Sequence, residues 1–265
     1  MVDQAVIPYL KRHAHGIRKK LVLHLSGIAE SAVDEKLRPL IQAHAGSGDT
    51  AVVFSLLPHQ GIVDIGVAVQ GSDELIVDDT LGRIKNEVHE LFGRAIFGQG
   101  SETLESVIGA LLMKYKRTIA VAESCTGGLL AAHLTSVSGS SAYFTCGIVS
   151  YSNIAKQQLL GVKQETLDGY GAVSEQTAVE MAEGARLRGA ADYAVAITGI
   201  AGPTGGTEKK PIGLVYIGLC SPTLKEAERF MFSGSRADIR HAACMRALTL
   251  LYHHLTETLH PHRAQ

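Results

Sequence analysis

The sequence predicts an α/β protein: a three-layer, mainly parallel sheet with helices on both faces, preceded by a small α+β domain. Its 265 residues, 46% of them hydrophobic, are enough for two domains with real cores. The last two thirds of the chain alternate strand and helix patterns, which is typical of parallel sheets. The first third has the different order β-α-β-β-α. We therefore expect an α+β domain over residues 1–99 and an α/β domain over residues 100–265.

The elements of the first domain follow from hydrophobic periodicity and turn signals. A Pro-His-Gln-Gly turn at residues 58–61 separates two of its strands. The predicted strands cover residues 20–25, 51–58 and 61–71, and the predicted helices cover residues 31–44 and 78–93. The stretch "IFGQGSETLE", residues 96–105, contains glycines and helix-capping residues, so we expect a linker there.

The second domain is predicted to alternate strands and helices around a glycine-rich loop at residues 199–211. Its strands are expected at residues 118–122, 145–151, 192–198, 212–219 and 226–232, and its helices at residues 103–116, 127–135, 153–160, 174–188 and 235–256. The last two strands are close enough to be antiparallel at one edge. Ligands of such sheets lie beyond the carboxyl ends of the strands. Ser124, Tyr151 and Thr198 are at or after strand ends, so one crevice is expected to collect them.

Composition excludes several classes of function. A net charge of −1 gives no general attraction to nucleic acid, and no apolar run approaches the roughly 18 residues of a membrane span. The N-terminus lacks the apolar region and cleavage site of a secretory signal. Four widely spaced cysteines without a CxxC pair fit a reduced, cytoplasmic protein. There are twelve histidines but no HExxH, and His253, His254, His260 and His262 are expected at a helix end and tail, so no metal site is predicted.

The stretch "VAESCTGGLLAAHLTS", residues 121–136, places polar and glycine residues on a strand-to-helix turn. Backbone N–H groups in the first turn of a helix have no intrahelical partner. A Ser or Thr hydroxyl there can cap the helix, or it can be a nucleophile beside a set of oxyanion donors. The stretch by itself leaves both interpretations open.

Tyr151 and Lys156 lie in "IVSYSNIAKQQLLGV", residues 148–162. Five residues of helix rotate about 500°, which would leave these side chains roughly 140° apart. They can converge only if Tyr151 precedes the helix and Lys156 lies inside it, which a cap at Ser152 or Asn153 permits. A desolvated lysine, or a phenol beside it, can act as a base. The alternative is an interfacial tyrosine and a solvated lysine.

Two further features are candidates for binding an anion. The loop with Gly199, Gly202, Gly205 and Gly206 lets backbone N–H groups approach a ligand, although it is neither a GxGxxG fingerprint nor a P-loop. Arg236 and Arg240 lie at i,i+4 where the last helix begins, an arrangement that suits a phosphate or carboxylate. An ordinary flexible loop and a solvated basic face are the alternatives.

Six motifs occur in an order that resembles one known family. They are "AESCTGGL", "SYSNIAKQQLLGV", "YGAVSEQTAVEMAEGA", "AITGIAGPTGG", "KPIGLVYIG" and "FSGSRADIR". Together they resemble the C-terminal domain of the competence/damage-inducible CinA family over about residues 100–257. Residues 17–98 resemble the family's KH-like middle domain, notably in "LHLSGIAESAVDEKL" and "GRAIFG", but contain no GxxG loop for RNA. The resemblance does not extend to the family's molybdopterin-binding-like domain, so we do not expect its ADP-ribose pyrophosphatase activity.

The resemblance implies a nicotinamide-nucleotide amidase of pyridine nucleotide salvage. Such a hydrolase converts nicotinamide mononucleotide to nicotinate mononucleotide and ammonia, without a metal or another cofactor. Ser124 would be the nucleophile, with Tyr151 and Lys156 as the base pair. Which of the two is the immediate base stays open. Backbone N–H groups of Cys125, Thr126 and Gly127 would hold the oxyanion. Candidates for the phosphate and ribose are Thr198, Gly199, Gly202, Gly205, Gly206, Arg236 and Arg240.

Other interpretations were weighed against this one. Cys125 is an intrinsically better nucleophile, but successive residues of the turn point apart. Glu123 is expected to support the loop by hydrogen bonding. A short-chain dehydrogenase needs Tyr-x-x-x-Lys and an N-terminal TGxxxGxG, and neither is present. The remaining alternative is a non-catalytic nucleotide-binding or interaction protein. We expect a homodimer, on the exposed sheet edge and on the family habit, and no nucleic-acid or membrane partner.

Overall fold

The computed structural model describes residues 16–45 and 50–259. The chain divides into two compact units, one ending at Ser101 and the other beginning at Glu102, which we call the N-terminal and C-terminal units. The expectations for residues 1–15 and for His260 and His262 fall outside the described residues. Within the described part of the chain, no helix is long and apolar enough to cross a membrane, and no group of three or more His, Cys, Asp or Glu side chains is arranged to hold a metal ion.

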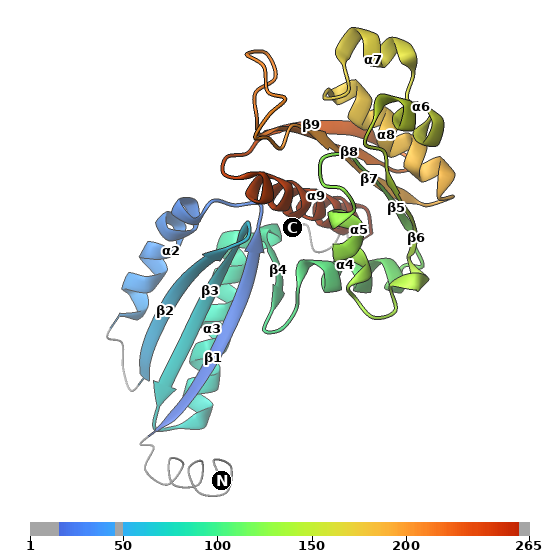
Figure 1. Ribbon diagram of the computed structural model, residues 1–265. Helices are drawn as coiled ribbons and strands as arrows, with labels where there is room; N and C mark the ends of the chain where they lie inside the picture. Colours follow the sequence, from blue (N-terminus) through green and yellow to red (C-terminus); the bar gives the residue numbers. More distant parts are fainter. Residues whose placement is uncertain (1–15, 46–49, 260–265) are drawn as a thin grey trace, which may run out of the picture. The chain divides into compact units, whose positions relative to one another are not determined.

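The described residues of the N-terminal unit form a four-stranded antiparallel sheet with two helices (Figure 1). The strand order is β2-β3-β1-β4. The elements are β1 (Ile17–Ser26), α2 (Glu30–His44), β2 (Thr50–His59), β3 (Ile62–Gly71), α3 (Glu74–Phe92), the 3-10 turn η2 (Gly93–Ala95) and β4 (Ile96–Gln99). Alternate residues of the strands, such as Leu23, Ile65 and Val67, form one core with Val33 of α2 and Ile84 of α3.

The prediction of a linker over residues 96–105 is wrong for its first part, which is a strand. Ile96–Gln99 forms β4, which pairs with β1 at Leu23, His24 and Leu25. The amide of Gly100 continues the attachment by donating to the carbonyl of Val22 at 3.0 Å. Four residues are too few to show a strand period, so this strand depends on the edge that β1 offers.

The C-terminal unit is a five-stranded sheet of order β6-β5-β7-β8-β9. Strand β5 is parallel to both β6 and β7, whereas β7–β8 and β8–β9 are antiparallel, so only β8 runs against the other strands of this sheet. The antiparallel edge is the expected one. The strands are β5 (Ile119–Glu123), β6 (Phe144–Val149), β7 (Tyr193–Gly199), β8 (Leu214–Cys220) and β9 (Lys225–Met231).

Helices cover both faces of this sheet, as the fold class requires (Figure 1). Ala194 and Ala196 of β7 point toward Met181 of α8, whereas the ring of Tyr193 contacts His254 of α9. Since neighbouring residues of a strand point to opposite faces, α8 and α9 lie on opposite sides. The helices are α4 (Leu104–Lys114), α5 (Leu129–Thr135), the 3-10 turn η3 (Ser140–Ala142), α6 (Asn153–Leu160), α7 (Gln164–Tyr170), α8 (Glu175–Arg188) and α9 (Arg236–Leu259).

Candidate active site

Ser124 directly follows β5, where the carboxyl ends of three strands meet. Its N–H donates to the carbonyl of Ile197 in β7 at 3.0 Å, and the N–H of Ser150, just after β6, donates to the carbonyl of Glu123 at 2.8 Å. These two bonds hold the three strand ends side by side. Ser124 is buried, with 9% of its surface exposed. Ligands of such sheets bind beyond the carboxyl ends of the strands, which is where Ser124 lies.

Lys156 is the group that contacts the Ser124 hydroxyl. Ser152 caps α6 by accepting the N–H of Ala155 at 3.1 Å, which places Lys156 in the first turn of that helix. Its Nζ donates to Ser124 Oγ at 3.0 Å and to the carbonyl of Ser150 at 2.7 Å. The residue is 1% exposed. Burial lowers the pKa of Lys156 to about 8, against a smaller opposing effect of Cys125, so a neutral amine is accessible near physiological pH.

Glu123 fixes the turn that carries Ser124. Its carboxylate is 1% exposed and accepts the N–H groups of Gly128 at 2.9 Å, Leu130 at 3.1 Å and Ala131 at 2.8 Å. The amides of the first turn of α5 stabilise the charge of the buried carboxylate. The carboxylate in turn accepts hydrogen bonds from amides that have no partner within the helix. These amides are therefore occupied and do not face a ligand, and none of them belongs to the donors expected from the sequence, Cys125, Thr126 and Gly127. The supporting role expected for Glu123 agrees with this geometry.

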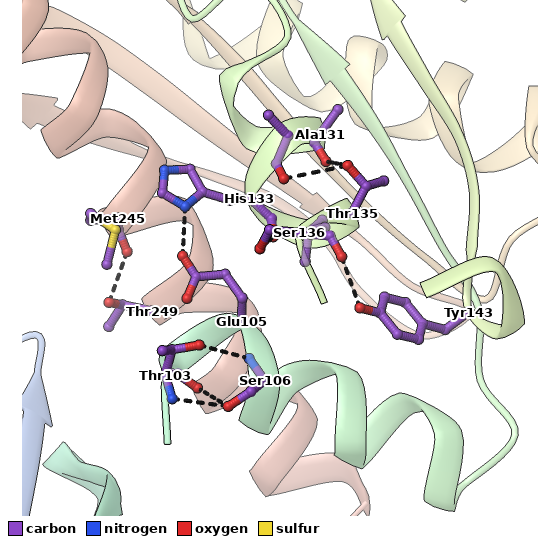
Figure 2. A network of polar contacts seen from close by, with 12 residues as sticks. Thr103, Glu105, Ser106, Ala131, His133, Thr135, Ser136, Tyr143, Met245 and Thr249 are labelled. Atoms are coloured by element: carbon purple, nitrogen blue, oxygen red, sulfur yellow. Dashed lines mark hydrogen bonds and ion pairs between the residues drawn. The ribbon is translucent and has the colours of Figure 1, made fainter. Parts of the chain in front are cut away.

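The other end of α5 is also held. Figure 2 shows Glu105 of α4 reaching His133 of α5, with Oε1 and Nδ1 2.5 Å apart. Tyr143 is fully buried and donates its hydroxyl to the carbonyl of Leu134 at 2.8 Å. Helix α4 itself begins with a capping box in which Thr103 accepts the N–H of Ser106 (Figure 2). With both ends of α5 anchored, the Ser124 turn has a rigid support.

The expected oxyanion donors differ in their availability. The N–H of Gly127 donates to the carbonyl of Ser124 at 3.1 Å, so it closes the turn. In the described part of the chain, the N–H groups of Cys125 and Thr126 have no hydrogen-bond partner. Arg240 Nη2 donates to the carbonyl of Thr126 at 2.6 Å and fixes that peptide. Cys125 and Thr126 are thus the backbone donors that remain beside Ser124.

Cys125 is present at this site as a neutral thiol. The residue is buried, and burial raises its pKa to about 11, although its own backbone amide, Lys156, Arg236 and Arg240 act in the opposite direction. The thiolate is the nucleophilic form of cysteine, and it is scarce at neutral pH under these conditions.

The Tyr151 hydroxyl is bonded to Arg236. The residue is 62% exposed, and its hydroxyl accepts a hydrogen bond from Arg236 Nη2 at 2.9 Å. Arg236 Nη1 donates in turn to the carbonyl of Gly202 at 2.6 Å. Tyr151 precedes α6 and Lys156 lies inside it, so the condition for convergence is met along the chain. Even so, the structure brings Lys156 and not the Tyr151 hydroxyl to Ser124.

Packing accounts for several of the other predicted binding residues. Thr198 is buried and donates its hydroxyl to the carbonyl of Ala172 at 2.7 Å. A Cβ at Gly199 would lie 2.6 Å from a methyl of Val215, and one at Gly202 would lie 2.7 Å from a methyl of Ile212. The last two glycines of the loop are exposed. A Cβ at Gly206 would meet Ile212 at 2.8 Å, and Gly205 has a φ of +87°. Close packing and turn geometry explain these residues without a ligand.

Two contacts of the site lie outside the predicted set. One is the carbonyl of Ser150, which holds Lys156. The other is Lys210, whose Nζ donates to the carbonyls of Tyr170 at 2.6 Å and Val173 at 2.7 Å and so fastens the glycine-rich loop. Backbone carbonyls have no residue-type signature, so a sequence pattern does not reveal the first contact. The second joins residues far apart in the sequence.

Comparison with known proteins bears on both units. Residues 101–255 match the family model described as the CinA C-terminal domain. The chain belongs to the CinA family. Residues 20–98 match the model described as the damage-inducible protein CinA KH domain. The CinA resemblance inferred from the six motifs and from the middle-domain motifs is therefore confirmed, and Ser124 and Lys156 both lie in the part matched to the CinA C-terminal domain.

Curated CinA relatives match nearly the whole chain. A CinA-like protein of Endomicrobium trichonymphae is 48% identical over 250 residues, which are 94% of this chain and 58% of that protein. A putative competence-damage inducible protein of Caldanaerobacter subterraneus is 40% identical over 255 residues, 96% of this chain and 60% of that protein. The chain thus spans 58–60% of the length of these CinA relatives.

Solved CinA structures share the fold. The competence/damage inducible protein CihA from Agrobacterium tumefaciens is 43% identical and has a TM-score of 0.55, covering 56% of this chain and 91% of its own. A CinA superfamily protein from Escherichia coli is 34% identical with a TM-score of 0.54, covering 60% of this chain and 96% of its own. These CinA proteins are matched over most of their own length by just over half of this chain.

Proposed function

We propose that the C-terminal unit is an amidase that hydrolyses the carboxamide of nicotinamide mononucleotide to nicotinate mononucleotide and ammonia. The observation that most supports this proposal is the contact of Lys156 Nζ with Ser124 Oγ at 3.0 Å, combined with a lysine pKa lowered to about 8. A hydroxyl next to a buried amine of this kind is an activated nucleophile. CinA membership supports the choice of substrate.

In the first half of the reaction, the neutral Lys156 amine takes the proton of Ser124 as Oγ attacks the carboxamide carbon. One N–H of the amine stays on the carbonyl of Ser150, which aims the nitrogen lone pair at the hydroxyl. The resulting tetrahedral oxyanion accepts hydrogen bonds from the N–H groups of Cys125 and Thr126. As the carbon–nitrogen bond breaks, Lys156 gives its proton to the leaving nitrogen, and ammonia departs from a nicotinoyl ester of Ser124.

In the second half, water attacks the ester carbon and Lys156 takes its proton. Collapse of the second tetrahedral species breaks the bond to Ser124 Oγ, which recovers the proton from Lys156. The carboxylic acid formed releases its proton to solvent, and nicotinate mononucleotide leaves. The anchoring of α5 by Glu123 and by Glu105–His133 supports this scheme, since the same backbone donors must serve both steps without moving.

The charge of the site favours an anionic substrate. Lys156, Arg236 and Arg240 all act electrostatically on Cys125, the neighbour of Ser124. The adjacent carboxylate, Glu123, is fully engaged with backbone amides. Arg236 and Arg240 are therefore our candidates for the phosphate, since guanidinium groups bind phosphate oxygens strongly. Gly205 and Gly206, which are exposed, are candidates for backbone contacts to the same group.

The proposal is tested by ammonia release from nicotinamide mononucleotide, with Ser124→Ala as the inactive variant and Cys125→Ala as its neighbouring control. We expect turnover by the wild type and by Cys125→Ala, a loss of at least 1,000-fold in Ser124→Ala, and a trapped nicotinoyl adduct on Ser124. Full turnover by a folded Ser124→Ala variant would end the scheme. A wild type that binds the mononucleotide and leaves it intact would indicate a non-catalytic binding protein instead.

A further inference from the structure

We propose that Tyr151 is a substrate-binding residue whose exposed ring face holds the cationic pyridinium ring of the substrate. This inference rests on the function proposed above. It assigns Tyr151 to recognition and assigns no proton to its hydroxyl, although the sequence motif by itself is equally compatible with a base.

The position of Tyr151 along the chain is fixed by its two neighbours. Ser150 donates its N–H to the carbonyl of Glu123 and accepts Lys156 Nζ on its own carbonyl. Ser152 caps α6. The Tyr151 backbone is therefore held beside Ser124, at the point where β6 passes into α6. Ser124 and Lys156 are 9% and 1% exposed, whereas Tyr151 is 62% exposed, so its ring is accessible to a ligand at this end of the sheet.

The Tyr151 ring is held in place by its hydroxyl. Among the described residues, that hydroxyl has Arg236 Nη2 as its hydrogen-bond partner, at 2.9 Å. Arg236 is fixed by its second bond, to the carbonyl of Gly202. A tyrosine anchored at its oxygen has little conformational entropy left to lose when a ligand contacts its ring. The same bond engages the oxygen with a cation, away from Ser124 and Lys156.

The charge distribution of the substrate explains why a ring is needed here. The pyridine nitrogen of nicotinamide mononucleotide is bonded to ribose, so the ring is a quaternary cation, and the phosphate at the other end is an anion. Arg236 and Arg240 suit the phosphate but disfavour the ring. The Glu123 carboxylate is buried beneath the turn and cannot offset this. An aromatic face attracts a quaternary cation through its quadrupole without adding a charge that would repel the phosphate.

The test separates recognition from proton transfer. Turnover and its pH profile are measured for wild type, Tyr151→Phe, Tyr151→Leu and, as a matched control, Tyr170→Leu, which changes another tyrosine that is more than half exposed. We expect Tyr151→Phe to keep kcat within about 3-fold with an unchanged pH profile and to raise KM slightly, because the ring remains but loses its bond to Arg236. Tyr151→Leu should raise KM roughly 3- to 30-fold with little change in kcat. Tyr170→Leu should match the wild type.

Binding to a cationic and an uncharged ring gives a second measurement. In the Ser124→Ala background, calorimetry compares nicotinamide mononucleotide with its reduced form, whose dihydropyridine ring has no charge. Replacement of Tyr151 by Leu should weaken binding of the cationic ligand roughly 3- to 30-fold and that of the reduced ligand by less than 2-fold.

Three results would overturn the inference. The first is a loss of 100-fold or more in kcat for Tyr151→Phe together with a displaced pH profile, which would make the hydroxyl a proton carrier. The second is an equal loss of affinity for nicotinamide mononucleotide and for its reduced form in Tyr151→Leu. The third is unchanged affinity of that variant for both ligands. Failure of the proposed function is distinguishable from these, since wild-type protein would then release no ammonia at all.

Discussion

Lys156 Nζ lies 3.0 Å from Ser124 Oγ, although the two residues are 32 positions apart in the chain. The contact exists because β5 and β6 are neighbours and because the first turn of α6 returns over their carboxyl ends. The neutral amine is the form that can accept the serine proton. With a lysine pKa of about 8, kcat/KM should rise as the pH increases through about 8 and then level off. A pH profile from 6 to 10 checks this, and a flat profile would contradict it.

The same lysine makes stability depend on pH. Its pKa is about 8 in the folded protein and about 10.5 in the unfolded chain, so the unfolded chain binds more protons between these values. Its contribution to the unfolding free energy therefore becomes more favourable as the pH rises from 8 to 10.5. The buried cysteines titrate in the opposite sense, so the measurement is a comparison with Lys156→Met. Urea unfolding at pH 7 and pH 10 gives the difference in unfolding free energy between Lys156→Met and the wild type. That difference should favour the variant less at pH 10 than at pH 7.

Glu123 should be essential to the stability of the Ser124 turn. Glu123→Ala removes the acceptor of the N–H groups of Gly128, Leu130 and Ala131, and should cost about 3 kcal/mol or more of unfolding free energy. Glu123→Gln keeps one acceptor and should lose less. The control is Glu183→Ala, which breaks a surface ion pair with Lys225 and should cost about 1 kcal/mol at most. Equal urea midpoints for the Glu123 and Glu183 variants would contradict the role.

The Cys125 thiol should be unreactive although it lies next to Ser124. Because burial raises its pKa to about 11, iodoacetamide at pH 7 should modify it much more slowly than a free thiol. Cys125→Ala should retain activity within about 3-fold, since its backbone N–H is unchanged. Mass spectrometry of the alkylated peptide and steady-state rates provide the two measurements. Rapid alkylation accompanied by loss of turnover would make the thiol the nucleophile.

Gly184 should control the placement of α6, the helix that carries Lys156. A Cβ at this position of α8 would lie 2.0 Å from the carbonyl oxygen of Leu160, the last residue of α6. Gly184→Ala should therefore destabilise the protein by about 1–3 kcal/mol and lower kcat. The matched control is Gly169→Ala in α7, where a Cβ meets nothing within 4 Å and where alanine should be neutral or slightly stabilising. Thermal unfolding of both variants decides between these outcomes.

Long periodic segments were predictable from the sequence, and so were short ones such as α6, whereas α7 and β4 were not. Strand β7 and helices α8 and α9 lie within three residues of the ranges that their apolar spacing indicated. Helix α7, Gln164–Tyr170, was missed because seven mostly polar residues show no face of their own. This helix is fixed from outside, for example by the hydroxyl of Thr166 on Glu180 at 2.8 Å. Strand β4 was also missed, because it depends on pairing with β1, which is far away in the sequence.

The sequence indicated which residues lie at the candidate site, but it did not indicate most of the contacts that they make. Ser124 and Lys156 are together, and Tyr151 precedes α6 as the sequence permitted, with the lysine buried and the tyrosine exposed. Spacing could not show that Arg236 would take the Tyr151 hydroxyl, because that bond joins residues 85 positions apart. Nor could it show that Gly202 and Gly206 are required by the side chain of Ile212.

Helix α9 supplies Arg236 and Arg240 and also covers one face of the sheet, and it is the last helix of the described chain. During translation, the serine and the lysine leave the ribosome well before these two arginines. A nascent chain that has not yet released α9 contains the reactive pair without the groups that hold the Thr126 peptide and the Tyr151 ring. In the amidase proposed above, the substrate site would thus be complete only after α9 has been synthesised, and chains that stop before it leave uncovered the face of the sheet on which α9 packs.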